Sequence, residues 1–206
     1  MQPSIAILEL DSIAHGIVVG DAMAKRSPLE VLRTGTVHPG RYLVLAGGQT
    51  GDVEEAVDAG RQAGASALIG LTFLPDVHPD VVAAIGGARR TAGEALGVIE
   101  TRTVTAAVEA ADAGVKNAEV VLRELRLADD LGGKAYILFG GPLTEVEAAV
   151  EHGVARIEGD AHPVTHVTIA QLHEEMDDNL WADARFMPRV AGAGSSDDAA
   201  ATRRGG

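Results

Sequence analysis

The sequence predicts an α+β protein in which one module, an antiparallel sheet with helices packed on it, occurs twice in tandem. Three observations lead to this fold class. The two halves of the 206-residue chain resemble each other in long, ordered blocks. Within each half, short apolar runs of strand length alternate with longer runs of helical period. Aromatic residues make up only 3% of the chain although 46% is hydrophobic, so Ala, Val, Leu and Ile must form the core, which suits thin layers of helix on sheet.

The internal repeat determines the predicted organisation. An early block pairs Glu9 with Glu100, and a later block pairs Arg41 with Lys134 at a separation two residues larger. These matches keep their order along the chain, which chance does not explain. We therefore predict two copies of one module.

Composition sets the predicted boundaries. The first module is expected at residues 4–86 and the second at 95–186. The stretch 87–94 between them is rich in small and basic residues, which indicates a flexible linker. Residues 187–206 carry almost no large apolar side chains, so we predict a disordered tail.

Each half is expected to contain four strands. An apolar strand comes first, a hairpin follows, and a fourth strand comes last. The hairpins are predicted from polar, Gly-containing turns at 38–40 and 129–133. The expected strands are 5–10, 29–37, 41–46 and 67–73 in the first half and 96–101, 120–127, 134–139 and 164–169 in the second.

Two helices and a short C-terminal helix complete each half. The first helix is expected at 14–26 and again at 104–117. Ser12 and Thr103 precede these helices and are the predicted N-caps. The second helix begins near Asp52 or Glu145, because a carboxylate in the first turn is favoured by the helix dipole.

Charge and cysteine content exclude several classes of protein. Asp and Glu number 30 against 17 Lys and Arg, which gives a net charge of −13 and argues against binding to nucleic acid or to an anionic membrane surface. The chain has no Cys, so disulfides, thiolate nucleophiles and Cys-ligated metals are excluded. The N-terminal segment lacks the basic region of a signal peptide, and the longest uncharged run, 62–75, is shorter than the ~20 residues of a membrane span. A soluble, cytoplasmic protein is predicted.

Known catalytic signatures are missing from the sequence. The Gly-rich run Gly47–Asp52 lacks the lysine of a phosphate-binding loop and is better explained as a turn at a strand end. His162 and His166 have the spacing of a helical metal pair, but Pro163 breaks such a helix, so loop histidines are the favoured interpretation.

Glu9 and Glu100 follow an apolar strand at equivalent places. A role in general acid or base catalysis is one interpretation. A charged strand end at an edge between subunits or facing solvent is the favoured one. We predict no enzyme, no catalytic residue, no metal site and no cofactor.

The second half contains the residues that identify a family. The run EALGVIETRTVTAAVEAADAGVKNAEVVLRE, residues 94–124, resembles the opening of a bacterial microcompartment shell domain, and the similarity continues over 131–153. The first half resembles the same family over 5–78. The resemblance implies a ferredoxin-like shell module present twice, as in the tandem-domain class whose trimers look like hexamers. The order of the elements resembles the unpermuted type, which is usually a single-layer tile.

The resemblance also implies a set of pore residues. In this family the turn between the second and third strands lines a central pore. The implied lining residues are His38, Pro39, Gly40, Leu131, Gly132 and Gly133. The implied pore mouth holds Thr36, Asp129 and Asp130, and Thr36 and Asp129 stand where hexameric relatives often have a lysine. Permeation is therefore expected to depend on solute charge.

Four residues are implied in contacts between tiles. Lys25 and Lys116 follow the first helix of each half and resemble the family's edge lysines, although a solvated lysine at a helix end is the alternative. His78 and His173 match a histidine that follows the family's last strand, but the arginine beside it is replaced here by Asp76 and Gln171, so the edge chemistry is expected to differ.

The predicted function is a structural shell tile whose central pore passes small metabolites. The expected partners are two further copies of the chain, hexameric and pentameric shell proteins, and small solutes in transit, with no nucleic acid and no membrane. The alternative is a trimeric regulatory protein that binds a small molecule at a subunit cleft. Self-assembly into sheets or shells would distinguish the two.

Overall fold

The computed structural model describes residues 4–157 and 165–182. The chain divides into two compact units between Ala170 and Gln171. The first unit holds both sheets, and the second contains helix α6 (Glu174–Ala182). The predicted tail and the predicted end of the second module at 186 lie outside the described residues.

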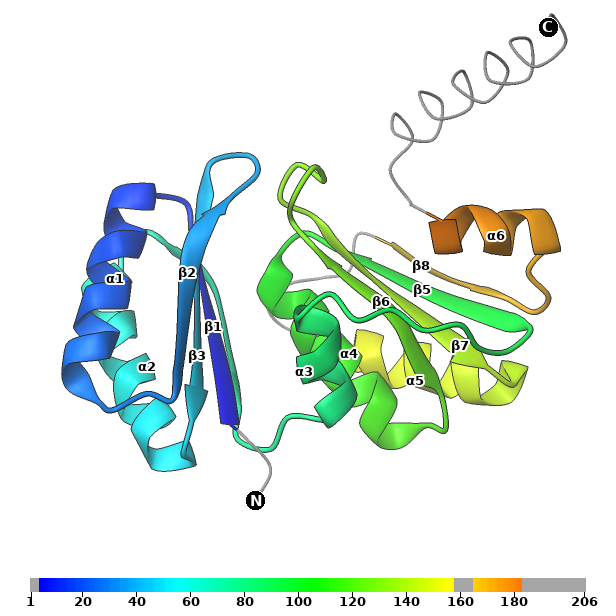
Figure 1. The fold of residues 1–206 in the computed structure, drawn as a ribbon, viewed down its shortest axis with the longest axis horizontal. Coiled ribbons are helices and arrows are strands. Elements are labelled where there is room, and N and C mark those ends of the chain that lie inside the picture. The colour runs from blue at the N-terminus through cyan, green and yellow to red at the C-terminus, as the bar shows by residue number, and fades with distance from the viewer. Residues whose placement is uncertain (1–3, 158–164, 183–206) are drawn as a thin grey trace, which may run out of the picture. The chain divides into compact units, whose positions relative to one another are not determined.

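The first half of the chain forms a four-stranded antiparallel sheet with two helices on one face (Figure 1). The strand order is β2-β3-β1-β4, so the leading strand is central. A third, short helix follows the last strand. The elements are β1 (Ser4–Leu10), α1 (Ile13–Arg26), β2 (Val31–Val37), β3 (Arg41–Gly48), α2 (Thr50–Gly64), β4 (Leu68–Leu74) and α3 (Pro79–Ile85).

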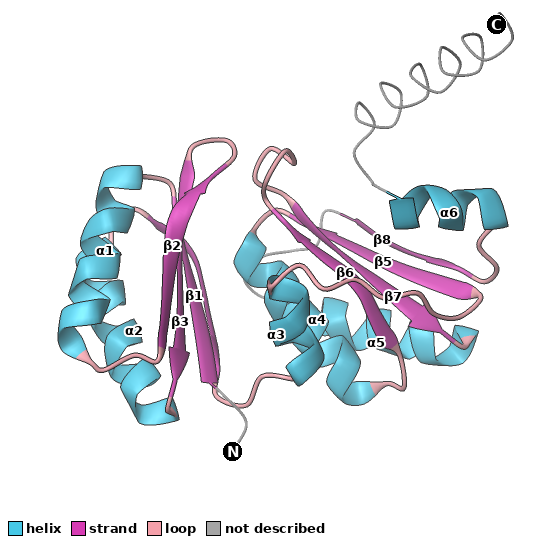
Figure 2. Cartoon of the chain, in the orientation of Figure 1, coloured by secondary structure: helices cyan, strands magenta, loops and turns pink. Residues whose placement is uncertain are grey.

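The second half repeats this arrangement in the order β6-β7-β5-β8 (Figure 2). Its elements are β5 (Ala95–Thr101), α4 (Val104–Asn117), β6 (Val121–Leu127), β7 (Ala135–Gly141), α5 (Leu143–Ile157) and β8 (Thr165–Ile169). The predicted α+β class with two tandem copies of one module is confirmed. Most boundaries differ from the predicted ones by one or two residues.

Both predicted N-caps are confirmed. The hydroxyl oxygen of Ser12 accepts a hydrogen bond from the N–H of His15 at 3.3 Å, and that of Thr103 accepts one from the N–H of Ala106 at 3.3 Å. Each cap satisfies a donor that the first helical turn leaves without a partner. The same chemistry therefore starts the same helix in both halves.

Small residues let the helices lie very close to the sheets. A Cβ added to Gly16 of α1 would lie 2.3 Å from the ring of Tyr42, and one added to Gly114 of α4 would lie 2.5 Å from the ring of Phe139. The two glycines thus make room for two of the chain's few aromatic side chains. This close packing agrees with the thin layers predicted from composition.

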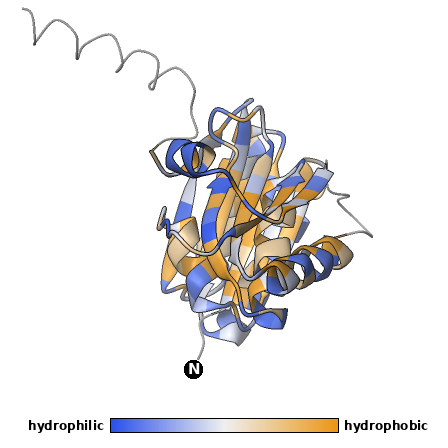
Figure 3. Cartoon of the chain, turned by 90° about the vertical axis from the view of Figure 1, so that its right-hand side faces the viewer, coloured by the Kyte–Doolittle hydropathy of each residue, from blue (hydrophilic) through white to orange (hydrophobic). Residues whose placement is uncertain are grey.

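Two hydrophobic clusters form the core of the first unit, and one of them is shared by both halves. A first cluster lies wholly within the first half and includes Leu8, Val19 and Met23. A second, larger cluster joins Ile5 and Leu74 of the first half to residues of α4 and β7 in the second half. Figure 3 shows the orange bands of hydrophobic residues on the strands. Because the second cluster crosses the boundary, the two modules are packed as one folded unit.

The segment between α3 and β5 is held against the second sheet. The N–H of Arg90 donates to the carbonyl of Arg123 in β6 at 3.0 Å, and the Arg90 guanidinium lies 2.8 Å from the carboxylate of Asp80. Arg89 forms an ion pair of 2.9 Å with Glu124. The composition of this segment predicted a flexible linker, but these contacts tether it, because backbone and arginine donors find acceptors on and beside β6.

Candidate functional site

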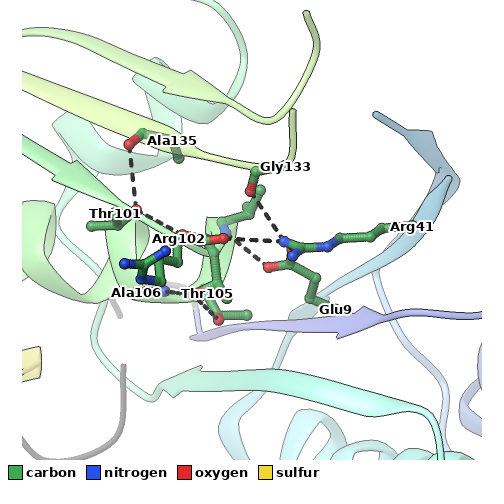
Figure 4. A network of polar contacts seen from close by, with 10 residues as sticks. Glu9, Arg41, Thr101, Arg102, Thr105, Ala106, Gly133 and Ala135 are labelled. Carbon is green, nitrogen blue, oxygen red and sulfur yellow. Dashed lines mark hydrogen bonds and ion pairs between the residues drawn. The ribbon is translucent and has the colours of Figure 1, made fainter. Parts of the chain in front are cut away.

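A buried carboxylate joins the two modules (Figure 4). Glu9 near the end of β1 accepts a hydrogen bond from the N–H of Val104 at 2.8 Å, and Val104 is the first residue of α4. The other Glu9 oxygen accepts from the Arg41 guanidinium at 2.7 Å. A carboxylate at a helix N-terminus is favoured by the free N–H groups and the helix dipole. Glu9 is therefore a second cap of α4, supplied by the other module.

Arg41 connects this carboxylate to the second hairpin. Its guanidinium donates to the carbonyls of Arg102 and Gly133, each at 3.1 Å, as well as to Glu9. The Glu9 side chain is fully buried and that of Arg41 is about one-quarter exposed. Burial raises the pKa of the Glu9 carboxyl above its ordinary value, and the hydrogen bonds from Arg41 and Val104 oppose that rise.

A second polar cluster joins the modules at the other end of α4. Lys116 lies 2.7 Å from the Asp112 carboxylate one turn before it and also donates to the carbonyl of Asp76. The N–H of His78 donates to the same Asp112 carboxylate at 2.8 Å. Lys116 and His78, which the resemblance places at tile edges, thus contact the opposite module within one chain.

The other two implied edge residues have different surroundings. Lys25 is highly exposed and contacts only Asp21, at 2.6 Å, among the contacts of the described residues. The ring Nδ1 of His173 accepts from the N–H of Glu175 at 3.3 Å, and that of His78 accepts from the N–H of Asp80 at 3.2 Å. Each histidine therefore stabilises the start of the short helix that follows it. A role at a tile edge remains a prediction for all four residues.

The structure brings the two implied pore loops together. A Cβ added to Gly133 would lie 3.0 Å from Cδ of Pro39 and 2.9 Å from the Arg41 guanidinium. Gly133 has a φ of +85° and Gly40 a φ of +107°, so both turns depend on glycine. The two hairpins are thus neighbours within one chain, on the side where Arg41 bridges them.

Most of the implied pore residues are accessible. His38, Pro39, Gly40 and Gly132 are exposed, Leu131 is partly buried and Gly133 is buried. At the implied mouth, Thr36, Asp129 and Asp130 are exposed. Asp130 has a φ of +63°, a conformation that Asp adopts more readily than most residues. These carboxylates and the His38 imidazole are free to meet solutes in water.

A cavity of about 320 Å³ lies at the contact between the modules. Its walls include Gly70 and Thr72 of β4, Thr105 of α4, and the ion pair of Arg156 with Glu109 at 3.0 Å. Thr72 donates across the contact to the carbonyl of Thr105 at 3.0 Å. Among the described residues that line the cavity, Arg156 is the one cation, and it is already paired with the Glu109 carboxylate.

Two kinds of feature are absent from the described residues, 4–157 and 165–182. No three His, Asp or Glu side chains there are close enough together to hold a metal ion. No helix within those ranges combines the length and apolar character that crossing a bilayer requires. His166 lies exposed on β8, and His162 is outside the described residues.

Sequence reasoning missed the part played by Arg41. Its counterpart in the repeat, Lys134, is also cationic and lies 2.7 Å from Glu100, the counterpart of Glu9. The signal was therefore present as a cation and a carboxylate matched together in both halves. The favoured interpretation of that strand end, an edge between subunits or facing solvent, is wrong for Glu9, because its carboxylate is fully buried between the two modules of one chain, where the N-terminus of α4 covers it.

Two copies of one module, packed so that a helix of one meets the sheet of the other, define a tandem-module protein with a head-to-tail internal contact. The model of the BMC domain family matches the chain twice, at residues 4–77 and 95–172. The chain belongs to this family of bacterial microcompartment shell proteins. Each match is continuous and begins at a leading strand, so neither half is permuted.

Similar proteins agree with this assignment. The bacterial microcompartment shell protein PduT of Citrobacter freundii is 37% identical over 151 residues, which cover 73% of this chain and 82% of that protein. The carboxysome shell protein CsoS1C of Halothiobacillus neapolitanus is 41% identical over 90 residues, 43% of this chain and 89% of its own. The shorter match corresponds to one module. The chain is thus a structural component of a microcompartment shell.

Solved structures support the fold. A microcompartment protein from Desulfitobacterium hafniense superposes with a TM-score of 0.75 and 35% identity, covering 86% of this chain and 99% of that one. A fused permuted hexameric shell protein of the RMM microcompartment gives a TM-score of 0.57 at 18% identity, covering 76% of this chain and 84% of that one. The second likeness concerns the fold alone.

Proposed function

We propose that three copies of the chain close into a pseudohexameric ring and that this trimer is a tile whose central pore passes small metabolites. The supporting observation is the contact between β1 and β4 of the first module and α4 of the second. This contact joins unlike faces, so apolar residues on the helix face of the first module and on the sheet face of the second, such as Ile17 and Val167, stay exposed. Repetition of such a contact by rotation produces a closed ring.

The hairpin loops support the position of the pore. The loop containing Pro39 and the loop containing Gly133 are in contact within one chain, which is the arrangement expected if both border one opening. Each chain would bring the His38 imidazole and the carboxylates of Asp129 and Asp130 to that opening. Charged groups around a narrow passage make permeation depend on solute charge.

We infer that the tile acts by position and selective passage, without turnover. Its family membership supports this, since the similar proteins are shell components. The proposed partners are two further copies of this chain, other shell proteins and the solutes that cross. The proposed modules are 4–86 and 95–186, and the contacts of Arg89 and Arg90 support treating 87–94 as a tethered connection.

Native mass spectrometry of the purified chain tests the trimer, and electron microscopy tests the tile. A mass of three chains is expected, together with sheets, tubes or closed shells on co-expression with hexameric and pentameric shell proteins. A strictly monomeric protein would overturn the ring. Discrete trimers that bind a small molecule tightly and never join a shell would favour the regulatory alternative.

A further inference from the structure

Residues that are buried at the internal contact between the modules have counterparts in the repeat that stay exposed. Val108 on α4 is 0% exposed because it faces the first module, whereas its counterpart in the repeat, Ile17 on α1, is 57% exposed. Val104 and Ile13 differ in the same way, since Val104 is buried and Ile13 exposed. The helix α1 therefore presents to water the apolar face that α4 buries.

The sheet face shows the complementary difference. Strand pairing makes Thr72 of β4 equivalent to Val167 of β8, because they pair with Ile7 and with its counterpart Val98. Thr72 is 2% exposed at the internal contact, and Val167 is 48% exposed. The second sheet thus carries an apolar surface where the first sheet is covered by a helix, and this surface matches the uncovered face of α1.

The ion pair that belongs to the internal contact also has a counterpart in the second module. Glu100 and Lys134 form an ion pair of 2.7 Å, as Glu9 and Arg41 do at the internal contact. Glu9 is 0% exposed and its second oxygen accepts from the N–H of Val104, whereas Glu100 is 29% exposed. The donor equivalent to the Val104 N–H is the N–H of Ile13, the first residue of α1, where Ser12 caps the N–H of His15.

The internal contact and the proposed contact between chains place their small and large side chains on opposite elements. At the internal contact Gly70 meets Thr105, and a Cβ on Gly70 would lie only 3.3 Å from Cβ of Thr105. The equivalent positions are Thr165, which pairs with Glu100 as Gly70 pairs with Glu9, and Ala14. The larger residue has moved from the helix to the strand and the smaller one from the strand to the helix. A sheet face that carries Thr165 therefore fits a helix that carries Ala14.

We propose that the Glu100–Lys134 pair of one chain caps helix α1 of a second copy, with the Glu100 carboxylate accepting from the N–H of the partner copy's Ile13. In the same contact, the apolar face of α1 packs on β5 and β8 of the neighbouring copy. This inference rests on the proposed trimer and specifies the chemistry that closes it. The site is incomplete in one chain, because its donor and its acceptor lie on opposite modules.

Cysteine cross-linking tests the pairing, since the natural chain contains no Cys. The variant that carries both Ala14→Cys and Thr165→Cys is oxidised and run on a denaturing gel without reductant. At the internal contact the equivalent Cβ atoms, that of Thr105 and one added to Gly70, would lie 3.3 Å apart. This is close to the distance of about 3.5–4.5 Å between the Cβ atoms of a disulfide, so we expect efficient linkage. A covalent three-chain species is expected, and it should collapse to one chain on reduction. The matched control is Ala14→Cys with Glu54→Cys, because Glu54 is exposed on α2 and has no place in the proposed contact.

The outcomes separate this inference from the proposed trimer. A trimer by native mass spectrometry with no linkage above that of the control would overturn the pairing and leave the trimer standing. A linked ladder that exceeds three chains would support the pairing and overturn the closed trimer. A monomer without linkage would overturn both. Linkage confined to three chains supports both.

Discussion

The carboxylate of Glu9 lies 2.8 Å from the backbone nitrogen of Val104, a residue 95 positions later in the chain. This single hydrogen bond connects the end of the central strand of one module to the start of the first helix of the other. It also distinguishes the two halves, because the equivalent Glu100 pairs with Lys134 and caps no helix among the residues that the structure describes.

Replacing Glu9 by Ala should destabilise the folded chain. The variant loses a charged hydrogen bond to a helix N-terminus and leaves Arg41 facing only carbonyls at a mostly buried position. Breaking such a pair costs about 3–5 kcal/mol in the free energy of unfolding, measured by urea titration. The control Glu54→Ala, on the exposed face of α2, should change it by less than ~0.5 kcal/mol. Equal effects of the two substitutions would contradict the role of Glu9.

The Glu9 carboxyl also predicts a pH dependence. Its pKa is raised above 4.5, chiefly by desolvation, so the folded state binds the proton more readily than the unfolded state does. The contribution of this group to stability is fully present below the unfolded pKa and is lost as pH rises through the folded pKa. As pH rises across that window, the free energy of unfolding of the natural chain should therefore fall relative to that of the Glu9→Gln variant. A difference that grows in the natural chain's favour would show the opposite shift.

Glu9 and Glu100 show which features of the fold and the site can be predicted from sequence. Their equivalence in the repeat is visible in the sequence, as are the caps Ser12 and Thr103, because these depend on local pattern. Sequence does not show that Glu9 is buried and Glu100 is not, because the chain makes the contact between modules only once. That asymmetry comes from tertiary packing.

The segment 87–94 and the pore loops show the same difference between what local sequence predicts and what tertiary packing adds. Composition predicted a flexible linker, but it does not report the acceptor that the carbonyl of Arg123 offers to Arg90. The resemblance implied two loops at one pore, and the structure places Pro39 beside Gly133. The role of Arg41, which bridges these loops, depends on tertiary contacts that the match to Lys134 in the repeat does not show.

Replacing Ile17 by Asp should prevent association while leaving the fold of the chain intact. Ile17 is exposed in one chain, so the substitution costs little there, but in the proposed trimer it places an unpaired charge in an apolar contact. Native mass spectrometry should show monomers, with an unchanged circular dichroism spectrum. The internal counterpart Val108→Asp should instead lower the free energy of unfolding by several kcal/mol, because Val108 is already buried. If the Ile17→Asp variant formed trimers as stable as those of the natural chain, this face of α1 would not be part of the contact between chains.

Replacing Glu100 by Gln should weaken the trimer without unfolding the chain. The amide still reaches the N–H of Ile13, but it loses the ion pair with Lys134 and the attraction of the helix dipole. A charged hydrogen bond of about 1.5–3 kcal/mol corresponds to a roughly 10- to 150-fold rise in the dissociation constant. Sedimentation or light scattering across a dilution series measures it. A dissociation constant equal to that of Glu54→Gln would remove Glu100 from the contact.

Replacing Lys25 by Ala should leave the trimer intact and weaken the assembly of tiles into sheets. Lys25 is exposed and contacts only Asp21 among the contacts of the described residues, so it is available to a neighbouring tile. Adding Lys116→Ala should also affect the chain itself, because Lys116 contacts Asp112 and the carbonyl of Asp76 across the modules. Electron microscopy of assembled material and urea unfolding of each variant separate the two effects. Sheets of normal extent from the Lys25 variant would count against its edge role.

Replacing Asp129 and Asp130 by Asn should change the passage of charged solutes through assembled shells and leave neutral ones unaffected. Both carboxylates are exposed beside the hairpin turn, where they would surround the proposed opening with negative charge. Their removal should speed the entry of anions and slow that of cations, with an effect that shrinks as ionic strength rises. Uptake of matched anionic, cationic and neutral small molecules into closed shells measures this, and Glu54→Gln with Asp58→Asn on α2 is the control of equal charge change. Identical uptake of all three solutes by the natural and doubly substituted shells would remove these aspartates from the pore.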